Sequence, residues 1–121
     1  MASSSEINPA RPAAGVRLCA LAEIADPGGK GFRFRVESRI FAGFIVRKGE
    51  LLAGYIDSCP HAGWPLATFD DRYLTRDAGH ILCTGHGALF TLDGAGATSP
   101  CLGLRLTPWN IAVREGNVFT G

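Results

Sequence analysis

The sequence predicts an all-β domain, a small antiparallel sandwich that carries one inserted subdomain. Three observations support this prediction. Short apolar runs alternate with polar residues at a period of two, 16 glycines and 7 prolines separate these runs, and only Ala20 to Ala25 could form a helical turn. The chain has 121 residues, of which 46% are hydrophobic, so it fits one domain with one core and leaves no room for an added catalytic domain.

The first strands are expected between residues 32 and 56. Residues 32–36 alternate phenylalanine or valine with arginine, which predicts a strand with one buried face. Residues 40–47 and 51–56 are apolar runs, and the sequence Arg47-Lys48-Gly49-Glu50 between them predicts a hairpin. Residues 1–15 are small, polar and proline-containing, so we expect a flexible tail there and one domain over residues 16–121.

The later strands follow a stretch of loop-forming residues. Residues 58–87 interrupt the strand pattern, and we expect the inserted subdomain there. Within and just after it, residues 81–83 and 88–92 flank a tight glycine turn. Trp109 belongs to an alternating run that predicts a further strand and places this tryptophan in the core. Glu115-Gly116-Asn117 then turns the chain into a last strand.

Charge and hydropathy exclude several kinds of partner. The 12 Lys and Arg residues nearly balance the 11 Asp and Glu residues, and no basic run is present, which disfavours nucleic acid and anionic membranes. No stretch reaches the roughly 20 apolar residues that span a bilayer. The sequence also shows no charged segment followed by an apolar one, so we expect no signal peptide and a cytoplasmic location.

Two short motifs carry the chemistry: Cys59-Pro60-His61 and Cys83-Thr84-Gly85-His86. Each offers one thiolate and one imidazole, and cysteines placed beside histidines indicate a metal before a disulfide when no secretion signal is seen. Four such ligands on two loops can close a metal site. Zinc modules usually pair like ligands, so a mixed pair in each loop is unusual for zinc.

The pattern Cys-x-His followed by Cys-x-x-His resembles the Rieske family, and the resemblance spans roughly Val16 to Phe119. The run from Cys83 to Phe90 matches the family's second loop, and Ser99-Pro100 is similar to its proline-bearing third loop. The resemblance implies a Rieske fold with a cluster-binding subdomain and one [2Fe–2S] cluster. It implies one iron bound by two cysteines and the other by two histidines; these ligands are Cys59, Cys83, His61 and His86.

Departures from the respiratory members of the family predict a low reduction potential. Those proteins carry a disulfide at the positions of Trp64 and Gly85, and a serine and a tyrosine at the positions of Ala88 and Phe90. The two missing hydroxyls would donate hydrogen bonds to the cluster, and their loss disfavours the reduced state. We therefore expect a low-potential, ferredoxin-type centre. A midpoint potential well above that of the hydrogen electrode would contradict this expectation.

The resemblance implies an electron carrier and not an enzyme. We expect a ferredoxin that passes electrons from a flavin-dependent reductase to a ring-hydroxylating or related terminal oxygenase. The chain has no G-x-G-x-x-G fingerprint and too few histidines for a second, catalytic iron site. Two alternatives stay open: a small subunit of a larger, nitrite-reductase-like oxidoreductase, and a zinc-stabilised or redox-sensing interaction module.

Four residues near these motifs have open roles. Cys19 lies in an apolar run and is expected to be a buried thiol. Cys101 could lie near the cluster or pack in the domain, and nothing argues for a disulfide between the two. His80 is expected to be a surface or strand-end residue and not a ligand. Trp64 is interpreted equally well as a core aromatic or as an exposed docking residue.

Overall fold

The computed structural model describes residues 9–58, 73–83, 88–98 and 102–121, which form eight strands and one short 3-10 helix. No α-helix occurs within these ranges, which confirms the all-β prediction. The elements in chain order are β1 Arg17–Ala20, η2 Leu21–Glu23, β2 Gly28–Val36, β3 Arg39–Lys48, β4 Leu51–Ile56, β5 Ile81–Cys83, β6 Ala88–Phe90, β7 Ile111–Arg114 and β8 Asn117–Thr120. None of the described segments contains a helix long and apolar enough to cross a bilayer.

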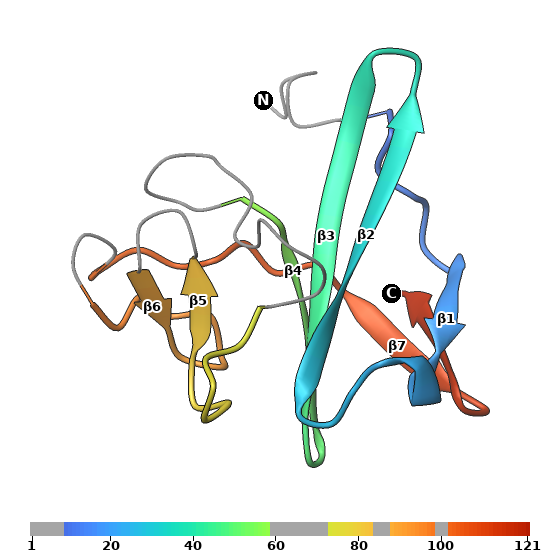
Figure 1. Ribbon diagram of the computed structural model, residues 1–121. Coiled ribbons are helices and arrows are strands. Elements are labelled where there is room, and N and C mark those ends of the chain that lie inside the picture. Colours follow the sequence, from blue (N-terminus) through green and yellow to red (C-terminus); the bar gives the residue numbers. More distant parts are fainter. Residues whose placement is uncertain (1–8, 59–72, 84–87, 99–101) are drawn as a thin grey trace.

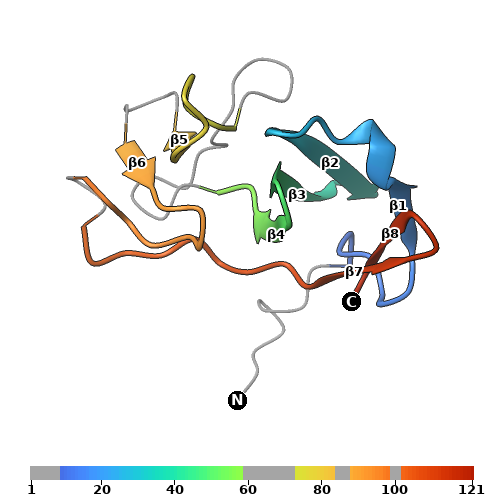
Figure 2. The same ribbon diagram turned by 90° about the horizontal axis from the view of Figure 1, so that it is seen from below.

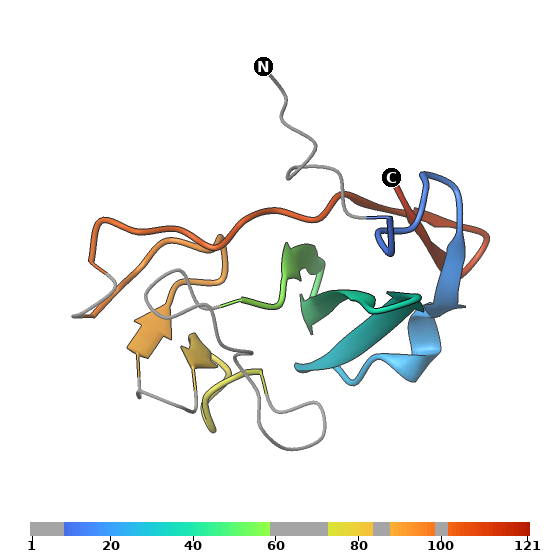
Figure 3. The same ribbon diagram turned by 90° about the horizontal axis from the view of Figure 1, so that it is seen from above.

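The described residues form three antiparallel sheets (Figure 1). The central sheet has the order β2-β3-β4, a second has β1-β8-β7, and β5 pairs with β6 alone. Seen from below and from above, the central sheet lies between the β5–β6 pair on one side and the β1-β8-β7 sheet on the other (Figures 2 and 3). The two outer sheets therefore cover different parts of the central one.

The central sheet consists of two antiparallel hairpins, of which the sequence predicted the second. Strands β2 and β3 pair from Gly28 with Arg47 to Val36 with Arg39, and β3 pairs with β4 over six further rows. The predicted turn at residues 47–50 joins β3 to β4, and Gly49 within it has a φ of +60°, which a glycine adopts without strain. The predicted alternation holds for residues 32–35, where the arginines are exposed and the phenylalanines are half-buried, but Val36 at the end of β2 is 41% exposed.

Trp109 is the centre of one of two apolar clusters. Its ring lies edge-on to three phenylalanine rings at centroid distances of 5.3 to 6.4 Å, and the side chain is 2% exposed. The three phenylalanines come from β2 and β3 and are Phe32, Phe34 and Phe41. Such edge-on pairs add to the energy of burial itself. The predicted core position of Trp109 is confirmed, and this cluster ties the central sheet to the chain termini through Cys19 and Val118.

The second apolar cluster joins the central sheet to the β5–β6 pair. Phe44 of β3 and Phe90 of β6 are both fully buried in it, together with Ile81 and Cys83 of β5. This cluster fixes the small β5–β6 pair against the larger sheet. It therefore positions the segments that hold the predicted ligands.

Replacing Gly43 by alanine is expected to destabilise the fold by about 1–3 kcal/mol, the usual cost of overpacking a well-filled core. A Cβ added at Gly43 would lie 2.5 Å from Cε3 of Trp109, where no side-chain atom fits. Urea unfolding should show a lower midpoint with an unchanged slope. An unchanged midpoint would mean that Trp109 does not pack on this glycine.

Candidate metal centre

Cys83 is the one predicted ligand that lies within the described residues. It is the last residue of β5, pairs with Ala88 across the antiparallel ladder, and is fully buried. Cys59, His61 and His86 lie outside the described residues, as do Trp64 and Cys101. The described residues next to the two motifs show where these leave the sheets. Ser58 precedes the first motif, and Cys83 and Ala88 stand on either side of residues 84–87 of the second.

A single residue, Tyr73, links the chain segments that lead into the two motifs. Its hydroxyl donates a hydrogen bond of 2.9 Å to Oδ2 of Asp57, two residues before Cys59. Its carbonyl accepts a hydrogen bond of 2.9 Å from the amide of Leu82, the residue before Cys83. The end of β4 and the arrowhead of β5 accordingly point to the same end of the molecule (Figure 1).

Packing holds the Tyr73 ring in place. The ring stacks on Phe44 with a centroid distance of 4.3 Å and an interplanar angle of 2°, and the side chain is 4% exposed. Gly31 of the neighbouring strand leaves space for the hydroxyl, because a Cβ there would clash with it. The packing therefore fixes the position of the Tyr73 hydroxyl that donates the hydrogen bond to Asp57.

The segment before the predicted third loop runs beside β6. The amide of Leu89 donates a hydrogen bond of 2.9 Å to Oγ1 of Thr98, and the amide of Ala97 donates one of 2.8 Å to the carbonyl of Leu89. Ser99, Pro100 and Cys101 lie outside the described residues. The residues just before them are thus fixed against the strand that follows the second motif.

The described residues at this end of the β5–β6 pair suit an iron–sulfur cluster. Cys83 supplies a cysteine side chain, the ligand that such clusters require, at the buried end of a strand. Its cross-strand neighbour Ala88 and the nearby Phe90 are both fully buried and carry no hydroxyl, so neither side chain adds a hydrogen-bond donor. Among the residues that the structure describes, no three His, Cys, Asp or Glu side chains gather into a metal site.

Cys19 is a buried thiol, as predicted. It is 2% exposed in the Trp109 cluster and is a free thiol. Burial raises the pKa of its thiol, with a smaller contribution from Glu23. A buried thiol with a raised pKa is unreactive, which fits a structural role.

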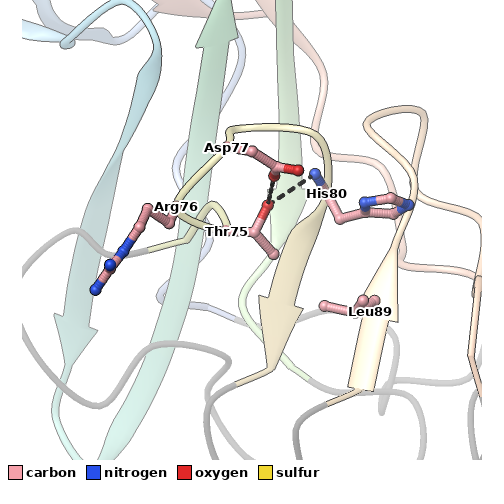
Figure 4. Close-up of a pocket in the computed structure, with 5 residues that line it drawn as sticks. All are labelled: Thr75, Arg76, Asp77, His80 and Leu89. Carbon is pink, nitrogen blue, oxygen red and sulfur yellow. Dashed lines mark hydrogen bonds between the residues drawn. The ribbon is translucent and has the colours of Figure 1, made fainter.

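His80 lies immediately before β5, as expected for a strand-end residue, and is half-buried. It lines an open cavity of about 580 Å³ together with Thr75, Arg76, Asp77 and Leu89 (Figure 4). The turn that precedes it is closed by its own hydrogen bonds, because Asp77 accepts from the Thr75 hydroxyl at 2.6 Å and from the Gly79 amide at 2.9 Å. These two donors lower the pKa of the Asp77 carboxyl.

Sequence reasoning missed the two residues that tie the ligand segments together, Asp57 and Tyr73. The carboxylate two residues before the first motif was visible in the sequence, but its hydrogen-bond partner was not, because the two residues lie 16 positions apart in the chain.

Comparison with known proteins agrees with this geometry. The family model for the Rieske [2Fe–2S] domain matches residues 16–108. No curated protein matches the sequence in a comparison of sequences. Among solved structures, the ferredoxin of carbazole 1,9a-dioxygenase from Nocardioides aromaticivorans IC177 is similar with a TM-score of 0.67 and 20% identity, over 90% of this chain and 98% of that one.

Two further solved structures share the fold. A quaternary ammonium Rieske monooxygenase is similar with a TM-score of 0.68 and 20% identity, over 98% of this chain but 33% of that one. A protein assigned as the small subunit of an NADPH nitrite reductase has a TM-score of 0.61 and 13% identity, over 90% of this chain and 99% of that one. With the family match spanning most of the sequence, this chain belongs to the Rieske [2Fe–2S] domain family, and the group it carries is one Rieske-type [2Fe–2S] cluster.

Proposed function

We propose that this chain is an electron carrier, a ferredoxin that passes electrons from a flavin-dependent reductase to a ring-hydroxylating or related oxygenase. The observation that carries the proposal is that the family match and the fold of a dioxygenase ferredoxin both extend over most of this chain. A carrier needs a cluster, a rigid support and a docking face, and a domain of this size can supply all three.

The proposed ligands are two cysteines for one iron and two histidines for the other, in the subdomain of residues 58–87; they are Cys59, Cys83, His61 and His86. When bound, the cluster accepts and releases one electron at a time. The described residues support the segments that lead into these ligands: Tyr73 joins the two segments, and the apolar cluster around Cys83 fixes β5. A rigid support limits the rearrangement that accompanies each electron transfer.

We expect the potential to be low for a Rieske centre, because Ala88 and Phe90 supply no hydroxyl beside the second motif. Replacing Ala88 by serine should raise the midpoint potential on the order of 60 mV, the one-electron equivalent of a charge-assisted hydrogen bond of about 1.4 kcal/mol. Protein-film voltammetry measures the shift. Ala112→Ser on the exposed surface of β7 is the control, and an equal potential in both variants would contradict this explanation.

The sequence carries no nucleotide-binding fingerprint, so a carrier of this kind would draw its electrons from a separate flavin-dependent reductase. We place it in the cytoplasm, where cysteines stay reduced and can serve as iron–sulfur ligands.

Reduction through a flavoprotein tests the proposal. The reductase component of a carbazole 1,9a-dioxygenase system, supplied with NADH in catalytic amounts, should bleach the visible spectrum of this protein. Dithionite reduction of the same sample is the control. A cluster that dithionite reduces but the flavoprotein does not would contradict the ferredoxin assignment.

A second candidate is a permanent small subunit of a larger oxidoreductase, which the fold of the assigned nitrite-reductase small subunit favours. Sedimentation of the isolated chain separates the two. A free carrier should sediment as a stable monomer, whereas a subunit without its partner should expose a large apolar surface and self-associate.

A further inference from the structure

The hairpin between β2 and β3 projects past the rest of the central sheet (Figure 1). Residues 33–40 form its tip, and we call them the arginine arm. Three arginines on it are exposed, and Val36 and Ile40 are 41% and 52% exposed. These arginines are Arg33, Arg35 and Arg39.

Part of the arm continues the face of the sheet that supports the metal centre. Residues paired across antiparallel strands share a face, and the faces alternate along a strand. Phe44 stacks on Tyr73 and pairs with Gly31 of β2. The next two pairs on this face of the sheet, toward the tip, are Ala42 with Arg33 and Ile40 with Arg35. Arg33, Arg35 and Ile40 therefore lie on the same face as Tyr73.

The arm also lies next to the segment that enters the first motif. The amide of Asp57 donates a hydrogen bond of 2.9 Å to the carbonyl of Ala42. Ala42 in turn pairs with Arg33 on its other side, so Arg33, Ala42 and Asp57 lie in one row across the sheet. Asp57 stands two residues before Cys59. A protein bound over the end of the molecule where this motif leaves the sheet would thus meet the arm.

The positive charge of the arm is not neutralised by the described part of the chain. The one ion pair in that part joins Arg47 to Asp26 over 4.0 Å, at the opposite end of the same hairpin. At the tip, Nε of Arg35 donates a hydrogen bond of 2.8 Å to the carbonyl of Glu37, and this neutral acceptor does not cancel the charge of the arginine. Glu37 is the one acidic residue among positions 33–40, against three arginines. The tip is therefore positive.

We propose that the arginine arm is a docking surface for an acidic patch on the protein that exchanges electrons with this domain. Arginine forks suit carboxylates, and Ile40 between them supplies apolar contact. A basic arm beside the ligand segments steers an acidic partner toward the cluster and releases it readily, as a carrier requires. The proposal rests on the proposed function as an electron carrier.

The experiment uses two haem proteins of opposite charge as probes: cytochrome b5, which is acidic, and cytochrome c, which is basic. The dithionite-reduced holoprotein is mixed with each oxidised probe in a stopped-flow instrument at low and high ionic strength. The variants are R33E/R35E and the milder R33Q/R35Q. The control is K48E/R114E, which changes net charge equally at exposed sites far from the arm, and circular dichroism checks the fold of each variant.

At low ionic strength, R33E/R35E should lower the second-order rate constant with cytochrome b5 at least about tenfold, the lower end of electrostatic steering. R33Q/R35Q should give a smaller loss, K48E/R114E should change the rate much less, and high ionic strength should remove the differences. Equal losses in R33E/R35E and K48E/R114E would overturn the docking proposal and leave the carrier intact. A wild-type protein that reduces neither cytochrome would overturn both.

Discussion

Replacing Cys83 by alanine is expected to abolish the iron–sulfur cluster. The thiol lies fully buried at the end of β5, beside the second motif, and alanine offers no ligand in its place. Because a cluster held by three ligands is not retained through purification, the variant should be colourless and contain no iron or acid-labile sulfide. Visible absorption and iron analysis measure the effect.

Cys19→Ala provides the matched control. Both cysteines are buried in strands, but Cys19 belongs to the other apolar cluster and forms no disulfide bond. This variant should keep the full spectrum and lose only about 1 kcal/mol of stability, typical of a core substitution. If Cys83→Ala kept its colour, or if Cys19→Ala lost it, the proposed ligand set would be wrong.

Replacing Tyr73 is expected to have the second-largest effect. Tyr73→Ala removes the ring that stacks on Phe44 and the side-chain hydrogen bond to Asp57, and should cost about 3–5 kcal/mol. Tyr73→Phe keeps the stacked ring and removes only the hydrogen bond to Asp57. Urea unfolding should therefore rank the two variants, with the phenylalanine variant losing about 1–2 kcal/mol.

The comparison that isolates the positioning role is Tyr73→Phe against Tyr55→Phe. Tyr55 is also buried in the second apolar cluster, and its hydroxyl donates a hydrogen bond of 2.7 Å to the carbonyl of Leu92 and not to Asp57. Both variants lose one hydrogen bond, but only Tyr73→Phe loosens the link between the ligand segments. Iron release to a chelator should be about tenfold faster in Tyr73→Phe, equivalent to about 1.4 kcal/mol, and unchanged in Tyr55→Phe. Equal release rates would assign Tyr73 a purely structural role.

The sequence predicted the parts of the fold that depend on local pattern. The turn at residues 47–50 and the alternation over residues 32–35 are local features, and both are confirmed. The burial of Trp109 was predicted from an alternating pattern and that of Cys19 from an apolar run, and both are confirmed too. The family was recognisable because the spacing of the two motifs is specific to its chemistry.

Contacts between distant segments could not be predicted in this way. Periodicity marks a strand but does not name its partner, so the pairing of β1 with β8, at opposite ends of the chain, came only from the structure. The same limit hid the link between Asp57 and Tyr73, because nothing in either local pattern points to the other residue. The ligand assignment at Cys59, His61 and His86, and the roles of Trp64 and Cys101, stay predictions because these residues lie outside the described ranges.

Low-temperature EPR of the purified protein, before and after dithionite, tests the central claim most directly. The account predicts a red-brown protein that is EPR-silent when oxidised and gives a rhombic signal with a low average g-value when reduced, as two histidine ligands on one iron require. A colourless protein that contains zinc and stays EPR-silent would contradict it. The two Cys–His motifs would then be a structural zinc site, and electron transfer would not be the function of this chain.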